Sequence, residues 1–69
     1  MNQTLFAHIL ALQGRTQQEV ARKIRLEPTV FQKKLEQIGD AEFTLGEIQA
    51  MQRLLRLDTA LVELLFFAD

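Results

Sequence analysis

Apolar residues recur every three or four positions in five separate segments of the chain. This spacing places them on one face of an α-helix, whereas a half-buried strand would show strict alternation of apolar and polar residues. The pattern predicts helices at residues 3–13, 17–24, 28–38, 45–56 and 59–67. We therefore expect an all-α fold: one compact five-helix domain that covers residues 1–69.

Two of the predicted helices begin with the same capping signal. Thr16 is followed three residues later by Glu19, and Thr44 by Glu47. In such a capping box the threonine hydroxyl accepts a hydrogen bond from the glutamate amide, and the glutamate carboxylate accepts one from the threonine amide. Helices are therefore predicted to begin directly after Thr16 and Thr44.

Other residues mark further helix ends. Pro28 suits the first position of a helix, because it has no amide to donate and its φ is fixed near the helical value. Asp58 is a good N-cap for the last helix. Gly14 and Gly39 adopt a left-handed backbone without penalty, so we expect them to end the first and third helices.

The periodicity also predicts which side chains face inward. The last helix has more apolar positions than one buried stripe needs. Phe66 and Phe67 are adjacent and point roughly 100° apart, so both cannot face the same core. One ring is expected to cover a partner or to pack on the first helix; in the alternative, a monomer closes its own core with both rings. The expected inward-facing residues are Leu5, Phe6, Ile9, Leu10, Leu12, Val20, Ala21, Ile24, Val30, Phe31, Leu35, Ile38, Ile48, Met51, Leu54, Leu55, Leu61, Leu64 and Leu65.

Composition limits the chemistry that the chain can perform. Its 69 residues include no cysteine and one histidine, His8. A disulfide or thiolate metal site is therefore excluded, and zinc would need several ligands besides His8. The sequence has no nucleophile–base pair and no glycine-rich phosphate loop, so we expect no enzyme, no metal, no cofactor and no small-molecule substrate. For so short a chain we expect a stability of roughly 3–5 kcal/mol.

Charge is distributed unevenly along the chain. Residues 15–34 contain six basic and two acidic residues, a local charge of +4, and residues 36–69 contain two basic and seven acidic residues, a local charge of −5. One face is therefore expected to meet an anion. The N-terminus lacks the pattern of a signal peptide, and no apolar stretch approaches the ~20 residues of a membrane span. We expect a cytoplasmic protein with no membrane partner.

Helices 17–24 and 28–38 are separated by about three residues, and so short a link forces their axes to cross steeply, as in a helix-turn-helix. This geometry needs a small residue where the two helices approach, an apolar residue in the turn, and a larger apolar residue on the inner face of the second helix. The chain has Ala21, Leu26 and Phe31 at these three places. The segment 16–24, Thr-Gln-Gln-Glu-Val-Ala-Arg-Lys-Ile, resembles the second helix of the lambda-repressor-like helix-turn-helix family. Residues 42–48 and 54–57 are similar to the part that follows the recognition helix in small phage-encoded members.

The resemblance covers about residues 5–66 and implies a sequence-specific DNA-binding transcriptional regulator, a repressor of phage or prophage type. In that family the residue after the cap threonine contacts a phosphate, and here it is Gln17. The start of the third helix would enter the major groove and read bases. Lys33 would donate to guanine, Gln32 would pair with adenine, and Thr29 would contact a base or a thymine methyl. The expected DNA-binding set is Gln17, Gln18, Arg22, Pro28, Thr29, Gln32, Lys33 and Lys34, with Arg22 and Lys34 meeting phosphate.

Three features depart from the family pattern. Arg25 stands where the family has glycine in the turn, and a left-handed arginine costs on the order of 1 kcal/mol there. Glu27 replaces a serine cap, and its carboxylate repels phosphate. The link 36–42 is longer than usual and contains Asp40 and Glu42. A second hypothesis is therefore a protein–protein interaction module on a helix-turn-helix fold, with weak or no DNA binding.

The expected partners are double-stranded DNA and a second copy of the chain, bound through the C-terminal helix. In the interaction-module hypothesis, the acidic C-terminal half and the surface at Phe66 and Phe67 would bind another regulator instead.

Overall fold

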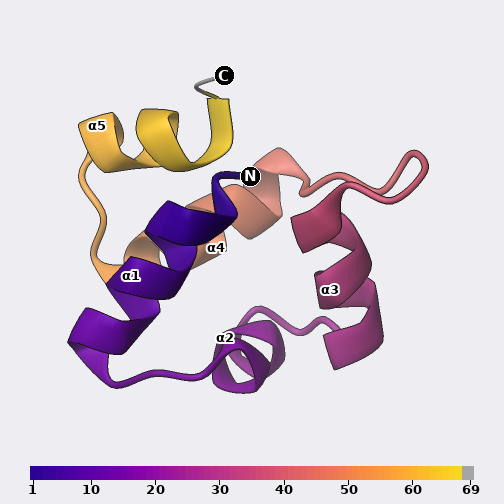
Figure 1. Cartoon of the computed structure of the whole chain (residues 1–69), viewed down its shortest axis with the longest axis horizontal. Helices are drawn as coiled ribbons and strands as arrows, with labels where there is room; N and C mark the ends of the chain where they lie inside the picture. The colour runs from indigo at the N-terminus through magenta and orange to yellow at the C-terminus, as the bar shows by residue number, and fades with distance from the viewer. Residues whose placement is uncertain (68–69) are drawn as a thin grey trace.

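A computed structural model describes residues 1–67. It contains five α-helices and one π-helical segment, and no strand occurs in that range. In Figure 1, α1 lies in front of α4 at the centre, α2 and α3 lie toward one end, and α5 with η1 lies toward the other. The elements are α1 (Gln3–Gln13), α2 (Gln17–Lys23), α3 (Pro28–Glu36), α4 (Leu45–Leu55), α5 (Thr59–Val62) and η1 (Glu63–Phe67).

The all-α prediction is confirmed, and the radius of gyration of 11.0 Å is that of a compact chain of this length. Helix starts agree with the sequence prediction. Over the part of the chain that the structure describes, no helix has the length and apolar character needed to cross a bilayer. The expected domain extended to Asp69, and its last two residues lie outside the described range.

A left-handed residue follows each of the first four helices within two residues, and three of these residues are not glycine. Gly14 (φ 66°) follows α1, Arg25 (φ 63°) follows the end of α2, Gln37 (φ 56°) follows α3, and Arg56 (φ 56°) follows α4. After each of them, the next amide donates back to a carbonyl five residues earlier, with N···O distances of 2.9–3.0 Å. This is the Schellman arrangement, which satisfies carbonyls that the helix end leaves free.

The third helix therefore ends earlier than predicted. The expectation was an end at residue 38 closed by Gly39, but α3 stops at Glu36 because Gln37 turns left-handed and the Ile38 amide donates to the Lys33 carbonyl. Ile38 is consequently exposed and is not part of the core. Gly39 (φ 63°) also has a left-handed backbone, but it lies in the loop beyond the helix.

The two predicted capping boxes differ. At α4 both hydrogen bonds are present between Thr44 and Glu47. At α2 the Thr16 hydroxyl accepts from the Glu19 amide at 3.1 Å, but the Glu19 carboxylate binds the Arg15 guanidinium at 2.7 Å. The second half of that box is not formed, because a cation next to the helix start provides a charged partner for the carboxylate.

The buried core is entirely apolar. Phe31 is 0% exposed, and its ring lies 6.0 Å from the Phe6 ring and 5.3 Å from the Phe43 ring, measured between centroids. Phe43 in turn lies 6.0 Å from Phe66. The core residues are Phe6, Ile9, Leu10, Val20, Ala21, Phe31, Leu35, Ile48, Met51, Leu55, Leu57, Val62 and Leu65.

Three more residues expected in the core are instead exposed: Leu12, Val30 and Leu64. Leu12 is 74% exposed at the end of α1, where residues 11–13 are all exposed. The next residue, Gln13, joins this turn to the end of α4, because its side-chain amide donates to the Leu55 carbonyl at 2.7 Å. Val30 and Leu64 lie on the outward faces of α3 and η1.

The last predicted helix, 59–67, is not one continuous α-helix. It is α-helical over Thr59–Val62 and π-helical over Glu63–Phe67, where the wider turn follows an i→i+5 pattern. Leu65 is buried and Phe66 is half-buried, whereas Phe67 is 62% exposed. The prediction that both rings cannot face the core is therefore confirmed.

Candidate nucleic-acid interface

A tight turn joins α2 to α3. The Arg25 amide donates to the Arg22 carbonyl at 3.0 Å, and the Leu26 amide donates to the Ala21 carbonyl at 2.9 Å. The chain then passes through Glu27, the N-cap residue, directly into α3. Figure 1 shows α2 almost end-on beside an upright α3, so the two axes cross steeply. The short link thus gives the crossing that the sequence predicted.

The residues at this crossing are those that the sequence indicated. Ala21 and Phe31 are both fully buried, and Leu26 is half-buried against the core. A small residue at position 21 lets the two helices approach closely. Between them remains a hollow of about 80 Å³, lined by Gln17, Gln18, Ala21, Pro28, Phe31 and Gln32.

One flank of α3 is bound to α2 through two glutamines. The side-chain amide of Gln17, the first residue of α2, donates a hydrogen bond to the side-chain oxygen of Gln32. Both residues are half-buried. Gln32 therefore lies at the edge of the exposed face of α3, with its oxygen already engaged.

The opposite flank of α3 is bound to α4. Lys34 Nζ donates to both carboxylate oxygens of Glu47, at 2.7 and 2.9 Å, and both side chains are only 17% exposed. Lys34 was expected to meet a phosphate. The structure instead places its ammonium in an ion pair, because the helical register points it toward the start of α4.

The environment of Glu47 favours its charged form. Burial by itself raises the pKa of the carboxyl group, but hydrogen bonds from Lys34 and from the Thr44 amide and hydroxyl, with the positive charge of Lys34, lower it by more. The net result is a Glu47 pKa below its usual value of 4.5.

The outward face of α3 carries Thr29, Val30 and Lys33, all of which are exposed. Val30, 37% exposed, was predicted to be buried. Val30 lies three residues before the exposed Lys33, so the two are neighbours on the same face of α3, and this spacing is the sequence signal that indicates an outer position. Side chains at these positions can reach a groove together.

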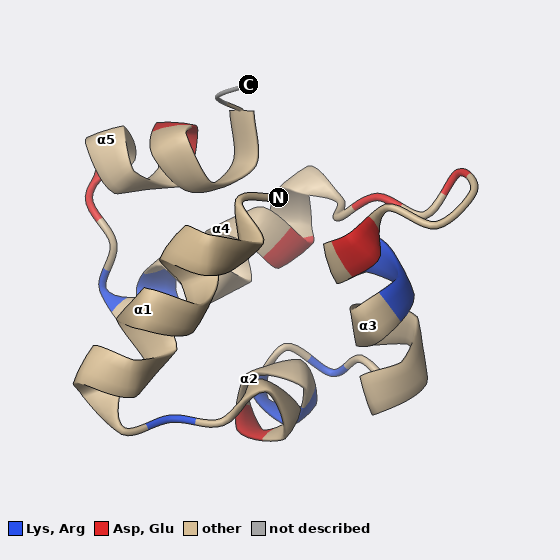
Figure 2. Cartoon of the chain, viewed as in Figure 1, with Lys and Arg blue, Asp and Glu red and all other residues tan. Residues whose placement is uncertain are grey.

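Basic side chains surround this face. Arg22, Lys23, Arg25 and Lys33 are exposed, and none of the four forms an ion pair within residues 1–67. In Figure 2, blue segments lie on α2, on the turn after it and on α3, α2 also carries one red segment, and further red segments lie at the end of α3, on the following loop and at the start of α4. The exposed Glu27 is an acidic residue at the start of α3.

The eight sequence-predicted site residues thus divide into two groups. Five are exposed on the α2–α3 unit: Gln18, Arg22, Pro28, Thr29 and Lys33. The other three are half-buried and engaged with a neighbouring element: Gln17, Gln32 and Lys34. Sequence reasoning missed Val30, and the site set did not include the exposed cations Lys23 and Arg25.

Comparison of the chain with family models, with curated proteins and with solved structures gives no match.

Proposed function

We propose that this chain binds double-stranded DNA, with α3 in the major groove and α2 across the backbone. The observation that carries the proposal is the outward face of α3. It presents Thr29, Val30 and Lys33 together, next to the free cations of α2 and the turn. An α-helix with its side chains is about 10–12 Å in diameter, which fits a major groove about 12 Å wide, and the nine residues of α3 give about 14 Å of helix to lie in it.

The side chains on this face have the chemistry of base recognition. A lysine ammonium donates to guanine O6 and N7, a threonine hydroxyl bonds to base edges, and an aliphatic side chain contacts the thymine methyl group. Arg22, Lys23 and Arg25 are placed to neutralise phosphates, which supply most of the affinity without reading sequence. Base reading by Lys33 and Thr29, and positioning by the arginines, are the roles that we assign.

The turn supports the same proposal. Arg25 adopts the left-handed conformation that glycine supplies at the matching position of the lambda-repressor-like family. The steep crossing of α2 and α3 is therefore compatible with a helix-turn-helix despite the arginine. A transcriptional regulator of repressor type, as that resemblance implies, is the biological role that we propose.

Fluorescence anisotropy with duplex DNA selected from a random pool tests the proposal. If Arg22, Lys23 and Arg25 each contact a phosphate, the plot of log K against log salt concentration should have a slope of about −2.7. Lys33→Gln should weaken binding and relax the base preference, and Arg22→Gln should reduce the magnitude of the slope by about 1. Arg53→Gln is the matched control, because it removes an exposed cation from α4, outside the α2–α3 unit.

The proposal fails if no duplex binds at micromolar protein and low salt. It also fails if Arg53→Gln weakens binding as much as Lys33→Gln and Arg22→Gln do, since the contact would then be a general charge effect.

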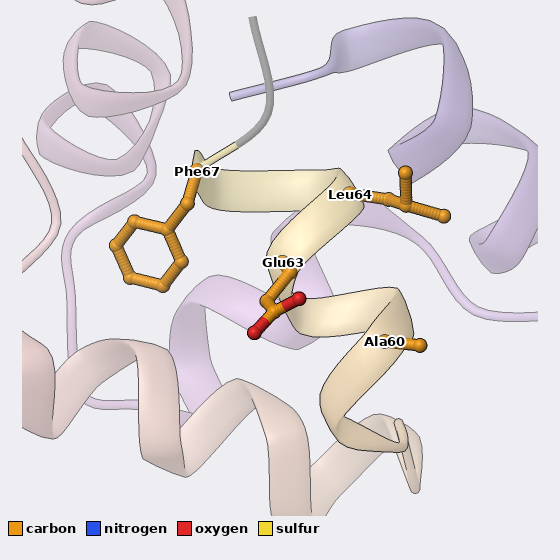
Figure 3. Close-up of a pocket in the computed structure, with 4 residues that line it drawn as sticks. All are labelled: Ala60, Glu63, Leu64 and Phe67. Carbon is orange, nitrogen blue, oxygen red and sulfur yellow. The ribbon is translucent and has the colours of Figure 1, made fainter.

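A second candidate function, a protein–protein interaction module, is favoured by one observation at the other end of the molecule. Leu64 and Phe67, 53% and 62% exposed, line a hollow of about 650 Å³ together with Ala60 and Glu63. Figure 3 shows these side chains standing away from the ribbon of α5 and η1. Apolar residues gathered at a hollow are typical of a protein-binding surface. A pull-down abolished by Phe67→Ser and unaffected by added DNA would support this function over the first.

A further inference from the structure

Helix α3 is held in place by three kinds of contact. Phe31 and Leu35 bury its inner face, Gln32 joins one flank to α2, and Lys34 joins the other flank to α4. Close packing of Phe31 and Leu35 sets which face of α3 points inward. Hydrogen bonds between charged groups are directional and shorter than neutral ones. The contacts at the flanks therefore add a directional constraint on the rotation of α3.

The contact on the α4 side is the stronger of the two because both partners are charged and only 17% exposed. Screening by salt is weaker for such a pair than for one on the open surface. The Glu47 carboxylate also takes part in the capping box at the start of α4. Besides binding Lys34, Glu47 Oε1 accepts from the Thr44 amide at 2.9 Å, and the Glu47 amide donates to the Thr44 hydroxyl at 3.1 Å. Lys34 is thus tied to the rigid first turn of α4.

The position of Lys34 makes this connection relevant to the outward face. Lys33 precedes Lys34 in the same helix, and successive residues of an α-helix point about 100° apart. Whatever fixes the direction of Lys34 therefore also fixes the direction of Lys33. A rotation of α3 that released Lys34 would turn Lys33 away from its present direction by the same angle.

We propose that Glu47 is a positioning residue for DNA recognition: through Lys34 it fixes the rotation of α3 and so aims Thr29, Val30 and Lys33 into the groove. The inference rests on the proposed DNA binding and assigns to Glu47 a part in it without contact to DNA. It also removes Lys34 from the phosphate-binding set.

The opposite interpretation predicts effects of opposite sign. In that interpretation Lys34 is a phosphate ligand, and Glu47 only competes with phosphate for its ammonium. Glu47→Gln would then free the Lys34 ammonium to bind phosphate. Binding then becomes tighter, and the salt slope becomes steeper by about 1. If Glu47 positions α3, Glu47→Gln weakens binding and leaves the salt slope unchanged, because no phosphate contact is lost.

The experiment measures duplex affinity and its salt dependence for four variants. We expect Glu47→Gln and Lys34→Met each to weaken binding about tenfold, a loss of about 1.4 kcal/mol, with the wild-type slope. Lys34→Arg should bind DNA with nearly wild-type affinity, because a guanidinium also pairs with a carboxylate. Asn2→Ala removes the N-cap of α1, where the side-chain oxygen accepts from the Leu5 amide at 3.0 Å, and leaves the Lys34–Glu47 ion pair and the charge unchanged. It should lower the melting temperature with little change in affinity, which separates positioning from a general loss of stability.

Backbone amide chemical shifts in the absence of DNA provide a second measurement. Glu47→Gln should shift the amides of residues 28–36 more than Asn2→Ala does. Tighter binding by Glu47→Gln, a slope reduced by Lys34→Met, or unchanged amides in α3 would overturn the inference. Failure of the wild-type chain to bind any duplex would overturn the proposed function instead, and the amide shifts would still decide whether Glu47 orients α3.

Discussion

Helix α3 and the segment α5–η1 both turn one face to solvent, but the two faces have opposite chemistry. The outward face of α3 carries Thr29 and Lys33 around a single aliphatic residue, whereas that of α5–η1 carries Leu64 and Phe67. Side chains fix both flanks of α3 to its neighbours. The last segment is held by apolar burial of Val62 and Leu65 and by one backbone hydrogen bond, in which the Asn2 amide donates to the Leu65 carbonyl at 2.7 Å.

This difference shows what each region can bind. A polar face of fixed orientation can match the donor and acceptor pattern of a base-pair edge, which requires direction. An apolar face gains from burial alone, which has little directional requirement and suits a protein surface. The two regions can therefore serve different partners in one small domain.

The largest expected effect is on stability, and it distinguishes the buried ring of Phe31 from the exposed ring of Phe67. Phe31→Ala should destabilise the protein by about 3–5 kcal/mol, because the ring is 0% exposed and its removal leaves a cavity between α1, α3 and the segment before α4. Since the total stability is expected to be of the same size, the variant should be largely unfolded in a thermal melt followed by circular dichroism. Phe67→Ala is the matched control and should melt near wild type; a folded Phe31→Ala would contradict the role of α3 in the core.

The next prediction concerns the Lys34–Glu47 ion pair, which joins α3 to α4, and tests it through the pH dependence of stability. Because the pKa of Glu47 is lowered in the folded state, its contribution to stability is complete above its usual value of 4.5 and is lost as the pH falls through the lower folded-state pKa. Hydrogen bonds to a charged group contribute about 1.5–3 kcal/mol, which sets the scale of the effect. Urea unfolding from pH 7 to pH 3 should show a smaller acid-induced loss of stability for Glu47→Gln than for wild type. Parallel curves would contradict the prediction.

A smaller effect is expected at the left-handed helix ends. Arg25→Gly and Arg56→Gly should each stabilise the protein by up to about 1 kcal/mol, because glycine adopts positive φ without the steric conflict of a Cβ. The two variants should differ in DNA affinity. Arg25→Gly also removes a cation next to α3 and should weaken binding, whereas Arg56→Gly should leave it unchanged. Equal affinities in the anisotropy assay would remove Arg25 from the interface.

The smallest effect on stability is expected at the apolar face of η1. Leu64→Glu should change the free energy of unfolding by less than about 0.5 kcal/mol, because the side chain is half exposed in the single chain. Analytical ultracentrifugation of wild type and variant tests the predicted homodimer directly. If a second copy covers this face, wild type should sediment as a dimer at high concentration and Leu64→Glu as a monomer. A monomer in both cases would exclude the dimer.

Much of the fold follows from local chemistry in the sequence. Capping residues act within one helical turn, so Thr44, Asp58 and Pro28 marked their helix starts correctly. Helix ends were harder to predict at α3, because Gln37 adopts a left-handed backbone against its intrinsic preference. The spacing of apolar residues likewise identified Ala21 and Phe31 as buried, since both lie at the centre of their stripes.

The sequence by itself determined the five helical segments, the short turn after α2 and the concentration of basic residues in α2 and α3. Only the tertiary structure decided which of those residues are free. Lys33 and Lys34 are adjacent and chemically identical, yet one is exposed and the other binds Glu47, thirteen residues away. Periodicity assigns a direction relative to the helix axis, but the availability of a side chain depends on what the rest of the chain places in that direction.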